Sequence, residues 1–84
     1  MNIIKIKDRL ENYFLNSKIE VFDSRGTGDH FSVIVISEQF INISLVNRHR
    51  MIYNLFEKEL TNSIHALQIQ AYTISEWKNK KNSK

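Results

Sequence analysis

A helix-like segment lying between two strand-like segments constrains the fold of this chain more than any other feature. Residues 30–37 alternate apolar side chains as a buried strand does, and residues 64–72 alternate again. Between them, residues 44–60 place an apolar stripe at the three- and four-residue spacing of an amphipathic helix. Because a strand, a helix and a second strand are normally joined by a right-handed crossover, the two strands are predicted to pair in parallel. The predicted helical stripe consists of Leu45, His49, Ile52, Phe56 and Leu60.

The segments before and after this unit complete the predicted fold. Residues 2–16 have the periodicity of an amphipathic helix, residues 18–23 alternate as a short strand, and residues 24–29 form the polar, glycine-containing loop of a hairpin. Thr73 with Glu76 three residues later is a capping-box pattern, which predicts a short final helix. The order αββαβα predicts a single small α/β (α+β) domain, in which helices pack on a three-stranded mixed sheet.

Length and composition indicate one small globular domain and do not favour an enzyme. A chain of 84 residues with 42% hydrophobic content can form one core but not a deep, enclosed active site. The pattern also offers no nucleophile, histidine and carboxylate that can be assembled into a catalytic arrangement. Since the sequence shows no apolar run of membrane-spanning length and no export leader, a cytoplasmic protein without a membrane partner is expected.

The net charge of +3 is located at the C-terminal end. Residues 1–77 contain 8 Lys and Arg against 9 Asp and Glu, a sum of −1, and residues 78–84 supply 4 further lysines. A short terminus rich in Lys, Asn and Ser is usually solvated and disordered. The sequence therefore predicts a folded domain at 1–77 and a basic, disordered tail at 78–84.

The chain has no cysteine and three histidines, His30, His49 and His65. Any metal site must therefore use imidazole, carboxylate or ligands that a partner supplies. His49 lies on the predicted apolar stripe, which favours a packed core residue over a ligand. Judged by position alone, His65 would be a structural residue that begins a strand and hydrogen-bonds a neighbour.

Several motifs of one protein family occur together in this chain, in the same order and at similar distances. They are Phe31 with its strand, Phe40, Asn47-Arg48-His49-Arg50-Met51-Ile52-Tyr53, Glu59-Leu60, Ile64-His65-Ala66-Leu67 and Tyr72-Thr73-Ile74-Ser75-Glu76-Trp77. With these motifs the chain resembles the BolA family from its first helix to Trp77. The resemblance implies a fold like that of the class II KH domain, which agrees with the order αββαβα.

The resemblance implies a binding partner rather than a catalyst. BolA-like proteins pair with monothiol glutaredoxins of the Cys-Gly-Phe-Ser type and share a bridged 2Fe-2S cluster with glutaredoxin and glutathione, for cluster transfer, maturation or iron sensing. Glutaredoxin and glutathione supply thiolates. The BolA-like protein supplies a histidine near its last strand and a cysteine or histidine from the loop between its first two strands. Neutral imidazoles in place of two thiolates lower the negative charge at one iron and raise the reduction potential.

His65 matches the family's ligand histidine by its place in the motif Ile64-His65-Ala66-Leu67. His30 is the candidate second metal ligand, because it follows the loop and precedes Phe31, as a histidine often does in this family. Thr27 stands where many relatives have the loop cysteine, and a threonine hydroxyl is a poor iron ligand. Either His30 is the second ligand, or ligation from the loop is lost.

The basic residues have two interpretations. Arg48 and Arg50 are expected at the surface, either solvated or in contact with a glutathione carboxylate or a phosphate. The alternative function is a KH-like, DNA-binding transcriptional regulator. The Gly-X-X-Gly phosphate loop of true KH domains is absent, and Asn42 stands where relatives usually have glycine, although Asn tolerates the left-handed backbone of such a turn. Weak DNA binding would then depend on Arg48, Arg50, Lys58, Lys78, Lys80 and Lys81.

A third interpretation is a scaffold that binds glutaredoxin without any cluster. The isolated chain is expected to be a monomer or a weak homodimer.

Overall fold

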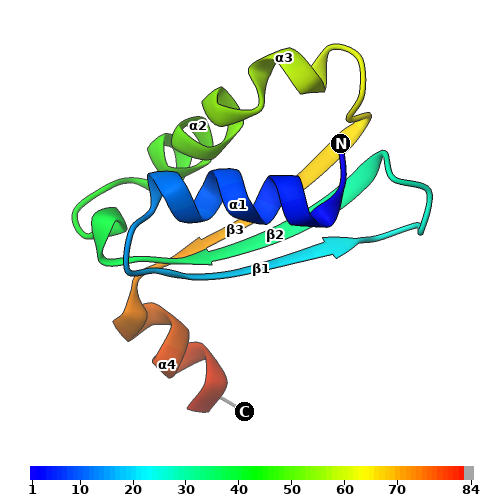
Figure 1. The fold of residues 1–84 in the computed structure, drawn as a ribbon. Coiled ribbons are helices and arrows are strands. Elements are labelled where there is room, and N and C mark those ends of the chain that lie inside the picture. The colour runs from blue at the N-terminus through cyan, green and yellow to red at the C-terminus, as the bar shows by residue number, and fades with distance from the viewer. Residues whose placement is uncertain (83–84) are drawn as a thin grey trace.

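The computed structural model describes residues 1–82 of this chain (Figure 1). The predicted order αββαβα is confirmed, with two additional short helices, η1 and α3. The elements are α1 (Ile3–Tyr13), β1 (Lys18–Asp23), β2 (His30–Ile36), η1 (Glu38–Phe40), α2 (Leu45–Leu55), α3 (Glu57–Leu60), β3 (Ala66–Tyr72) and α4 (Ile74–Asn82). Within residues 1–82, no helix is both long enough and apolar enough to cross a bilayer.

The three strands form one mixed sheet in the order β1-β2-β3. Strands β1 and β2 form an antiparallel hairpin, in which Val21 lies opposite Val33. Strands β2 and β3 run parallel, with Val33 opposite Ile69, so the predicted parallel pairing is confirmed. Because β2 and β3 run in the same direction, their first residues lie side by side at one end of the sheet.

Helices α1, α2 and α3 cover one face of the sheet, while α4 lies beyond the end of β3 (Figure 1). The core lies between the helices and the sheet, where apolar side chains of α1, of α2 and of the inner sheet face pack together. This packing confirms that the first helix is amphipathic, with Ile6, Leu10 and Phe14 buried, although its apolar Ile3 and Tyr13 are exposed. The large side chains that are fully buried include Ile6, Leu10, Phe14, Phe31, Val33, Val35, Phe40, Ile52, Phe56 and Ile64.

The central helix differs from the prediction in its length and in its buried face. The predicted helix at 44–60 is divided into α2 and α3. Leu45, expected on the buried stripe, is 65% exposed, and His49 is only half-buried. Ile52 and Phe56 of the predicted stripe are buried, but the other buried residue of α2 is Arg48, which lies four residues before Ile52 and therefore on the same side of the helix. The prediction was wrong for the first part of the stripe, because an apolar pattern does not allow for a buried arginine.

The predicted capping box at the start of α4 is confirmed. The Glu76 carboxylate accepts a hydrogen bond from the Thr73 backbone N–H at 2.8 Å, and the Thr73 hydroxyl accepts one from the Glu76 N–H at 3.2 Å. The helix continues to Asn82. Residues 78–82 are therefore helical, which corrects the prediction of a disordered tail at 78–84; residues 83–84 lie outside the described residues.

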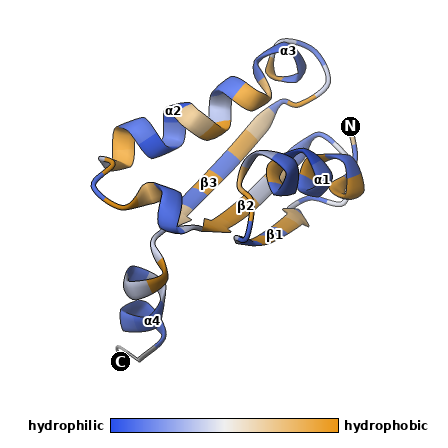
Figure 2. Ribbon diagram, turned by 60° about the vertical axis from the view of Figure 1, so that its left-hand side comes forward, coloured by the Kyte–Doolittle hydropathy of each residue, from blue (hydrophilic) through white to orange (hydrophobic). Residues whose placement is uncertain are grey.

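Contacts between lysines and aromatic rings favour the helical conformation of this basic segment. The ammonium nitrogen of Lys80 lies 5.3 Å from the ring centroid of Tyr72, and that of Lys81 lies 5.7 Å from the ring centroid of Trp77. Positive charges in the last turn are also favoured by the negative end of the helix dipole. In Figure 2 this hydrophilic end of α4 projects away from the sheet and the other helices.

Candidate metal site

The parallel pairing of β2 and β3 brings the two predicted metal ligands together. His30 is the first residue of β2, and His65 immediately precedes β3. His30 lies opposite Ala66 in the register, which places His65 beside Asp29. The Asp29 carbonyl oxygen accepts hydrogen bonds from the backbone N–H groups of His65, at 2.7 Å, and Ala66, at 3.3 Å. The backbone therefore holds both histidines at the same end of the sheet.

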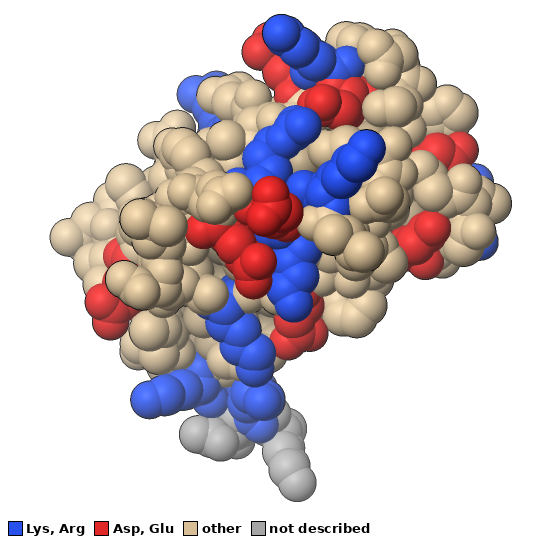
Figure 3. All heavy atoms as spheres, in the orientation of Figure 1, with Lys and Arg blue, Asp and Glu red and all other residues tan. Residues whose placement is uncertain are grey.

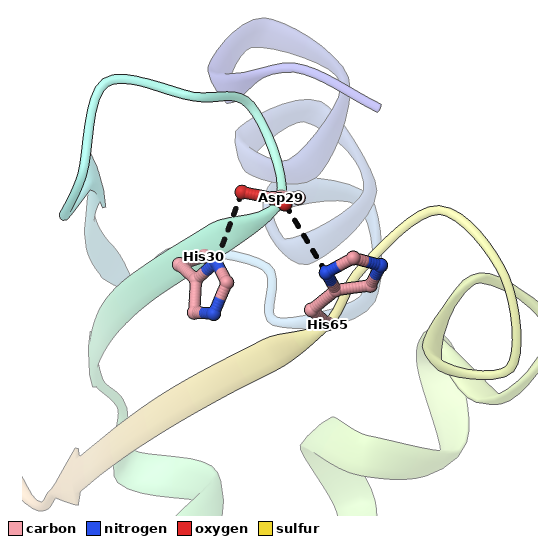
Figure 4. A group of neighbouring side chains, drawn as sticks. All are labelled: Asp29, His30 and His65. Atoms are coloured by element: carbon pink, nitrogen blue, oxygen red, sulfur yellow. Dashed lines mark hydrogen bonds and ion pairs between the residues drawn. The ribbon is translucent and has the colours of Figure 1, made fainter.

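The Asp29 carboxylate lies between the two imidazole rings (Figure 4). Its Oδ1 atom is 2.9 Å from His30 Nδ1, and its Oδ2 atom is 3.2 Å from His65 Nδ1. The ring centroids are 5.8 Å apart, and the ring planes are nearly perpendicular, at 88°. One potential ligand atom from each of the three side chains lies within 4.8 Å of the other two. Since each Nδ1 is directed at the carboxylate, each Nε2 faces away from it.

The loop before β2 is organised by hydrogen bonds to Asp23. The Asp23 carboxylate accepts hydrogen bonds from the backbone N–H groups of Gly26 and Gly28, each at 2.9 Å. Both glycines have left-handed backbone conformations, with φ of 70° and 75°. Thr27, between them, donates a hydrogen bond from its hydroxyl to Oδ1 of Asp29. Thr27 therefore orients the carboxylate that contacts both histidines.

The site is negatively charged and open to solvent. The hydrogen bond from Thr27, followed by the hydrogen bond to His30, lowers the pKa of Asp29 from 3.8 to about 2, so its carboxylate is ionised at neutral pH. The side chain of His65 is 66% exposed, while those of Asp29 and His30 are 31% and 20% exposed. Such a group can bind a divalent transition-metal ion, or it can offer imidazole ligands to a cluster carried by another protein.

Asp29 was not among the ligands predicted from the sequence. The available signal was a carboxylate directly before a candidate histidine at the end of a loop. The strand register adds the decisive information, because it places His65 beside Asp29 as well. His49 lies on α2 and is not a member of this group.

Arg48 and Arg50 lie in different environments. The two terminal nitrogens of Arg48 form a two-point ion pair with the Glu76 carboxylate, at 2.6 and 3.2 Å. Arg48 Nε also donates to the Ile43 carbonyl at 2.8 Å, and Nη1 donates to the Ala71 carbonyl at 3.2 Å. The expected surface role of Arg48 is therefore wrong, because its donors connect α2 to β3 and α4. Arg50 is exposed, as predicted.

The remaining basic residues proposed for DNA contacts lie on α3 and α4. Lys58, Lys78, Lys80 and Lys81 are all exposed. In Figure 3 basic side chains gather around the projecting α4, whereas basic and acidic side chains lie next to each other over the body of the molecule. Asn42 has φ of 64°, so the left-handed turn expected at this position is present.

Comparisons with known sequences agree with this structure. The sequence profile of the BolA-like protein family matches residues 6–76. The chain is 36% identical over 80 residues to the DNA-binding transcriptional regulator BolA of Escherichia coli, and the alignment covers 87% of this chain and 76% of the relative. It is 39% identical over 77 residues to the Haemophilus influenzae protein of the same name, and this alignment covers 88% of this chain and 75% of the relative.

Solved structures show the same similarity. The BolA domain of SufE1 from Arabidopsis thaliana matches with a TM-score of 0.79 at 37% identity, covering 87% of this chain and 92% of that chain. The yeast protein Fra2 matches with a TM-score of 0.73 at 30% identity, covering 92% of this chain and 84% of that chain. By its sequence and by its fold, this chain belongs to the BolA family.

Proposed function

We propose that this chain is a non-enzymatic partner of a monothiol glutaredoxin, with which it co-ligates a glutathione-bound 2Fe-2S cluster. The observation that carries the proposal is the meeting of His30 and His65 at one end of the β2–β3 pair, where His65 is open to solvent. These two residues would be the ligands from this chain. Because the chain contains no cysteine, the thiolate ligands would come from glutaredoxin and glutathione.

The chemistry of the two histidines fits this role. His30 Nδ1 is hydrogen-bonded to the Asp29 carboxylate, an arrangement that selects its Nδ1–H tautomer and leaves its Nε2 as a lone-pair donor, and His65 Nδ1 lies 3.2 Å from the other carboxylate oxygen. His65 is exposed enough to be reached by a group carried on another protein. The Thr27 hydroxyl is engaged with Asp29, so His30 is the loop ligand in this proposal.

The cluster, when bound, would supply one-electron chemistry and a transferable iron–sulfur unit. The imidazoles of this chain would leave less negative charge on one iron than thiolates do, which raises the reduction potential. Since an imidazole must be neutral at its coordinating nitrogen, acid weakens this ligation. Both properties suit a protein that transfers or senses a cluster.

The test is to mix the purified chain with a cluster-loaded monothiol glutaredoxin and record visible absorption and circular dichroism. We expect a spectrum that neither protein gives alone. This spectrum should be lost in His65→Ala and weakened or altered in His30→Ala, while both variants remain folded. His49→Gln is the matched control, because it removes the third imidazole from α2 without changing the site.

Two outcomes would contradict the proposal. An unchanged spectrum with folded His65→Ala would remove His65 from the site. A mixture that forms a complex but keeps the spectrum of glutaredoxin alone would favour a scaffold that binds without ligating the cluster.

DNA binding is the second candidate function, because the relatives from Escherichia coli and Haemophilus influenzae are named as DNA-binding transcriptional regulators. The structural feature that favours it is the group of exposed lysines on α4. Arg48 is engaged with Glu76 and is not presented to a phosphate. Tight, sequence-specific binding by a chain that lacks 78–84, relaxed by Arg50→Ala, would support base readout by the folded domain.

A further inference from the structure

We propose that the isolated chain binds one divalent transition-metal ion through His30, His65 and Asp29. The proposal concerns a single ion held without a partner protein, and it adds a carboxylate as the third ligand. It therefore depends neither on glutaredoxin nor on a cluster.

The distances in the site are close to those between ligands of one ion. Asp29 Oδ1 is 2.9 Å from His30 Nδ1, and Asp29 Oδ2 is 3.2 Å from His65 Nδ1. Ligand atoms that are each about 2.1 Å from a zinc ion lie roughly 3.0–3.4 Å from one another, for angles between about 90° and 109°. The hydrogen bond from His30 and the approach of His65, which meet different oxygens of the Asp29 carboxylate, therefore each have nearly the separation of two ligands of one ion.

The remaining adjustment is a movement of the two imidazoles toward a common ion. One ligand atom from each residue already lies within 4.8 Å of the others. The His65 side chain is 66% exposed and can change rotamer, whereas His30 is held by β2 and Asp29 by the Thr27 hydroxyl. The site thus combines two positioned ligands with one that can close on an ion.

Coordination through Nδ1 requires no net loss of a proton from a neutral imidazole. The proton that His30 Nδ1 now shares with Asp29 moves to Nε2 through solvent, and His65 binds the ion as its Nε2–H tautomer, so that the Nδ1 lone pair of each ring is directed at the ion. Asp29 changes from hydrogen-bond acceptor to ligand. The Thr27 hydroxyl remains on its Oδ1 atom, as outer partners do that orient carboxylate ligands.

The donor set selects the class of ion. Two imidazole nitrogens and one carboxylate oxygen suit zinc and its first-row neighbours, whereas Mg²⁺ and Ca²⁺ prefer oxygen ligands throughout. The exposure of His65 leaves space for water as a further ligand, as in zinc sites with three protein ligands. Zn²⁺ should bind more tightly than Co²⁺.

Titration of Co²⁺ and Zn²⁺ into the chain, purified without a histidine tag, tests this proposal. We expect one ion per chain and visible Co²⁺ bands that disappear when Zn²⁺ is added. In ¹⁵N NMR spectra of the Zn²⁺-loaded chain, the Nδ1 atoms of His30 and His65 should show the coordination shift. Asp29→Asn, His30→Ala and His65→Ala should each weaken binding about tenfold or more. Circular dichroism establishes that each variant is folded, and His65 is exposed enough for its replacement to leave the core unchanged.

Asp8→Asn and His49→Gln are matched controls, because they remove an exposed carboxylate from α1 and the remaining imidazole from α2. Both should bind as the parent chain does. Absence of binding, binding that folded Asp29→Asn leaves unchanged, or loss of binding in His49→Gln would each overturn the proposal. The outcome is separate from that of the glutaredoxin assay, since a chain that binds Zn²⁺ but gives no mixed cluster spectrum would refute the proposed function and leave this inference standing.

Discussion

Arg48→Ala should remove the side chain that connects α2 to β3 and α4. Arg48 is 5% exposed, and its loss takes away the donors that now lie 2.8 Å from the Ile43 carbonyl and 3.2 Å from the Ala71 carbonyl. A buried polar group left without a partner costs about 1–3 kcal/mol. The guanidinium also lies 5.6 Å from the Phe40 ring centroid. Such a cation–π contact contributes about 0.5–1 kcal/mol.

Two effects limit the expected loss. The Glu76 side chain is 46% exposed, so its carboxylate is hydrated once Arg48 is gone, and its ion pair contributes less than about 1 kcal/mol. Water can also enter the space left by the arginine side chain and donate hydrogen bonds to the carbonyl groups of Ile43 and Ala71. We therefore expect the free energy of unfolding to fall by about 2–4 kcal/mol. This is a large share of the roughly 4–13 kcal/mol expected for a domain of this size.

Trp77 provides the assay for this prediction. It is the single tryptophan of the chain, it lies on α4, and its ring centroid is 5.3 Å from that of Tyr72. Urea unfolding followed by Trp77 fluorescence reports on α4, while far-ultraviolet circular dichroism reports on the whole domain. Arg50→Ala is the matched control, since this exposed arginine should change stability by no more than about 0.5 kcal/mol. Equal unfolding midpoints for Arg48→Ala and Arg50→Ala would refute the reasoning.

Three further predictions concern acid, the left-handed turn and DNA. The hydrogen bonds from Arg48 lower the pKa of Glu76 from 4.5 to about 2. The contribution of the ionised Glu76 to the free energy of unfolding is therefore complete above pH 4.5 and is lost as the pH falls toward 2. Glu76→Gln should remove this contribution from a curve of unfolding free energy against pH. Asn42 has φ of 64°, so Asn42→Ala should destabilise by roughly 1 kcal/mol in urea unfolding, whereas Asn42→Gly should not destabilise. Duplex DNA should bind weakly, and the fall of the binding constant with salt concentration should correspond to roughly two to four phosphate contacts. When the lysines of α4 are replaced by glutamine, a binding titration should show a weaker dependence on salt.

The fold could be predicted from the sequence where two signals agreed. Apolar residues alternate in β2 and β3, and the segment between them has a helical period. This pattern predicted a parallel pair joined by a crossover helix, and the structure confirms it. Thr73 and Glu76 predicted the start of α4 because a capping box is a local interaction. The end of α4 could not be predicted in the same way. Lys80 and Lys81 contact the rings of Tyr72 and Trp77 in this part of the helix, and composition does not reveal such contacts.

The buried face of α2 shows a different limit. Apolar periodicity placed Leu45 on the core side, but Arg48 takes that side because its guanidinium donors find acceptors in β3, in α4 and in the preceding loop. Pairing between distant segments decides whether a charged residue can be buried, and a helical period contains no information about it. The same limit applies to Asp29. A shift of the β2–β3 register by one residue would separate its carboxylate from His65.

The two proposed occupants of this site require opposite tautomers of the same imidazoles, which leads to a prediction about their competition. Without metal, Asp29 accepts a hydrogen bond from His30 Nδ1 and lies 3.2 Å from His65 Nδ1, and the Nε2 atoms of both rings lie on the side away from the carboxylate. An ion held by Asp29 and both Nδ1 atoms places the ring protons on Nε2, so the lone pairs offered to a cluster are lost. Zn²⁺ added at one equivalent should therefore slow the appearance of the mixed spectrum with cluster-loaded glutaredoxin, and His49→Gln should be slowed equally. A mixed spectrum that forms at the same rate with and without Zn²⁺ would show that the ion and the cluster do not compete for these two histidines.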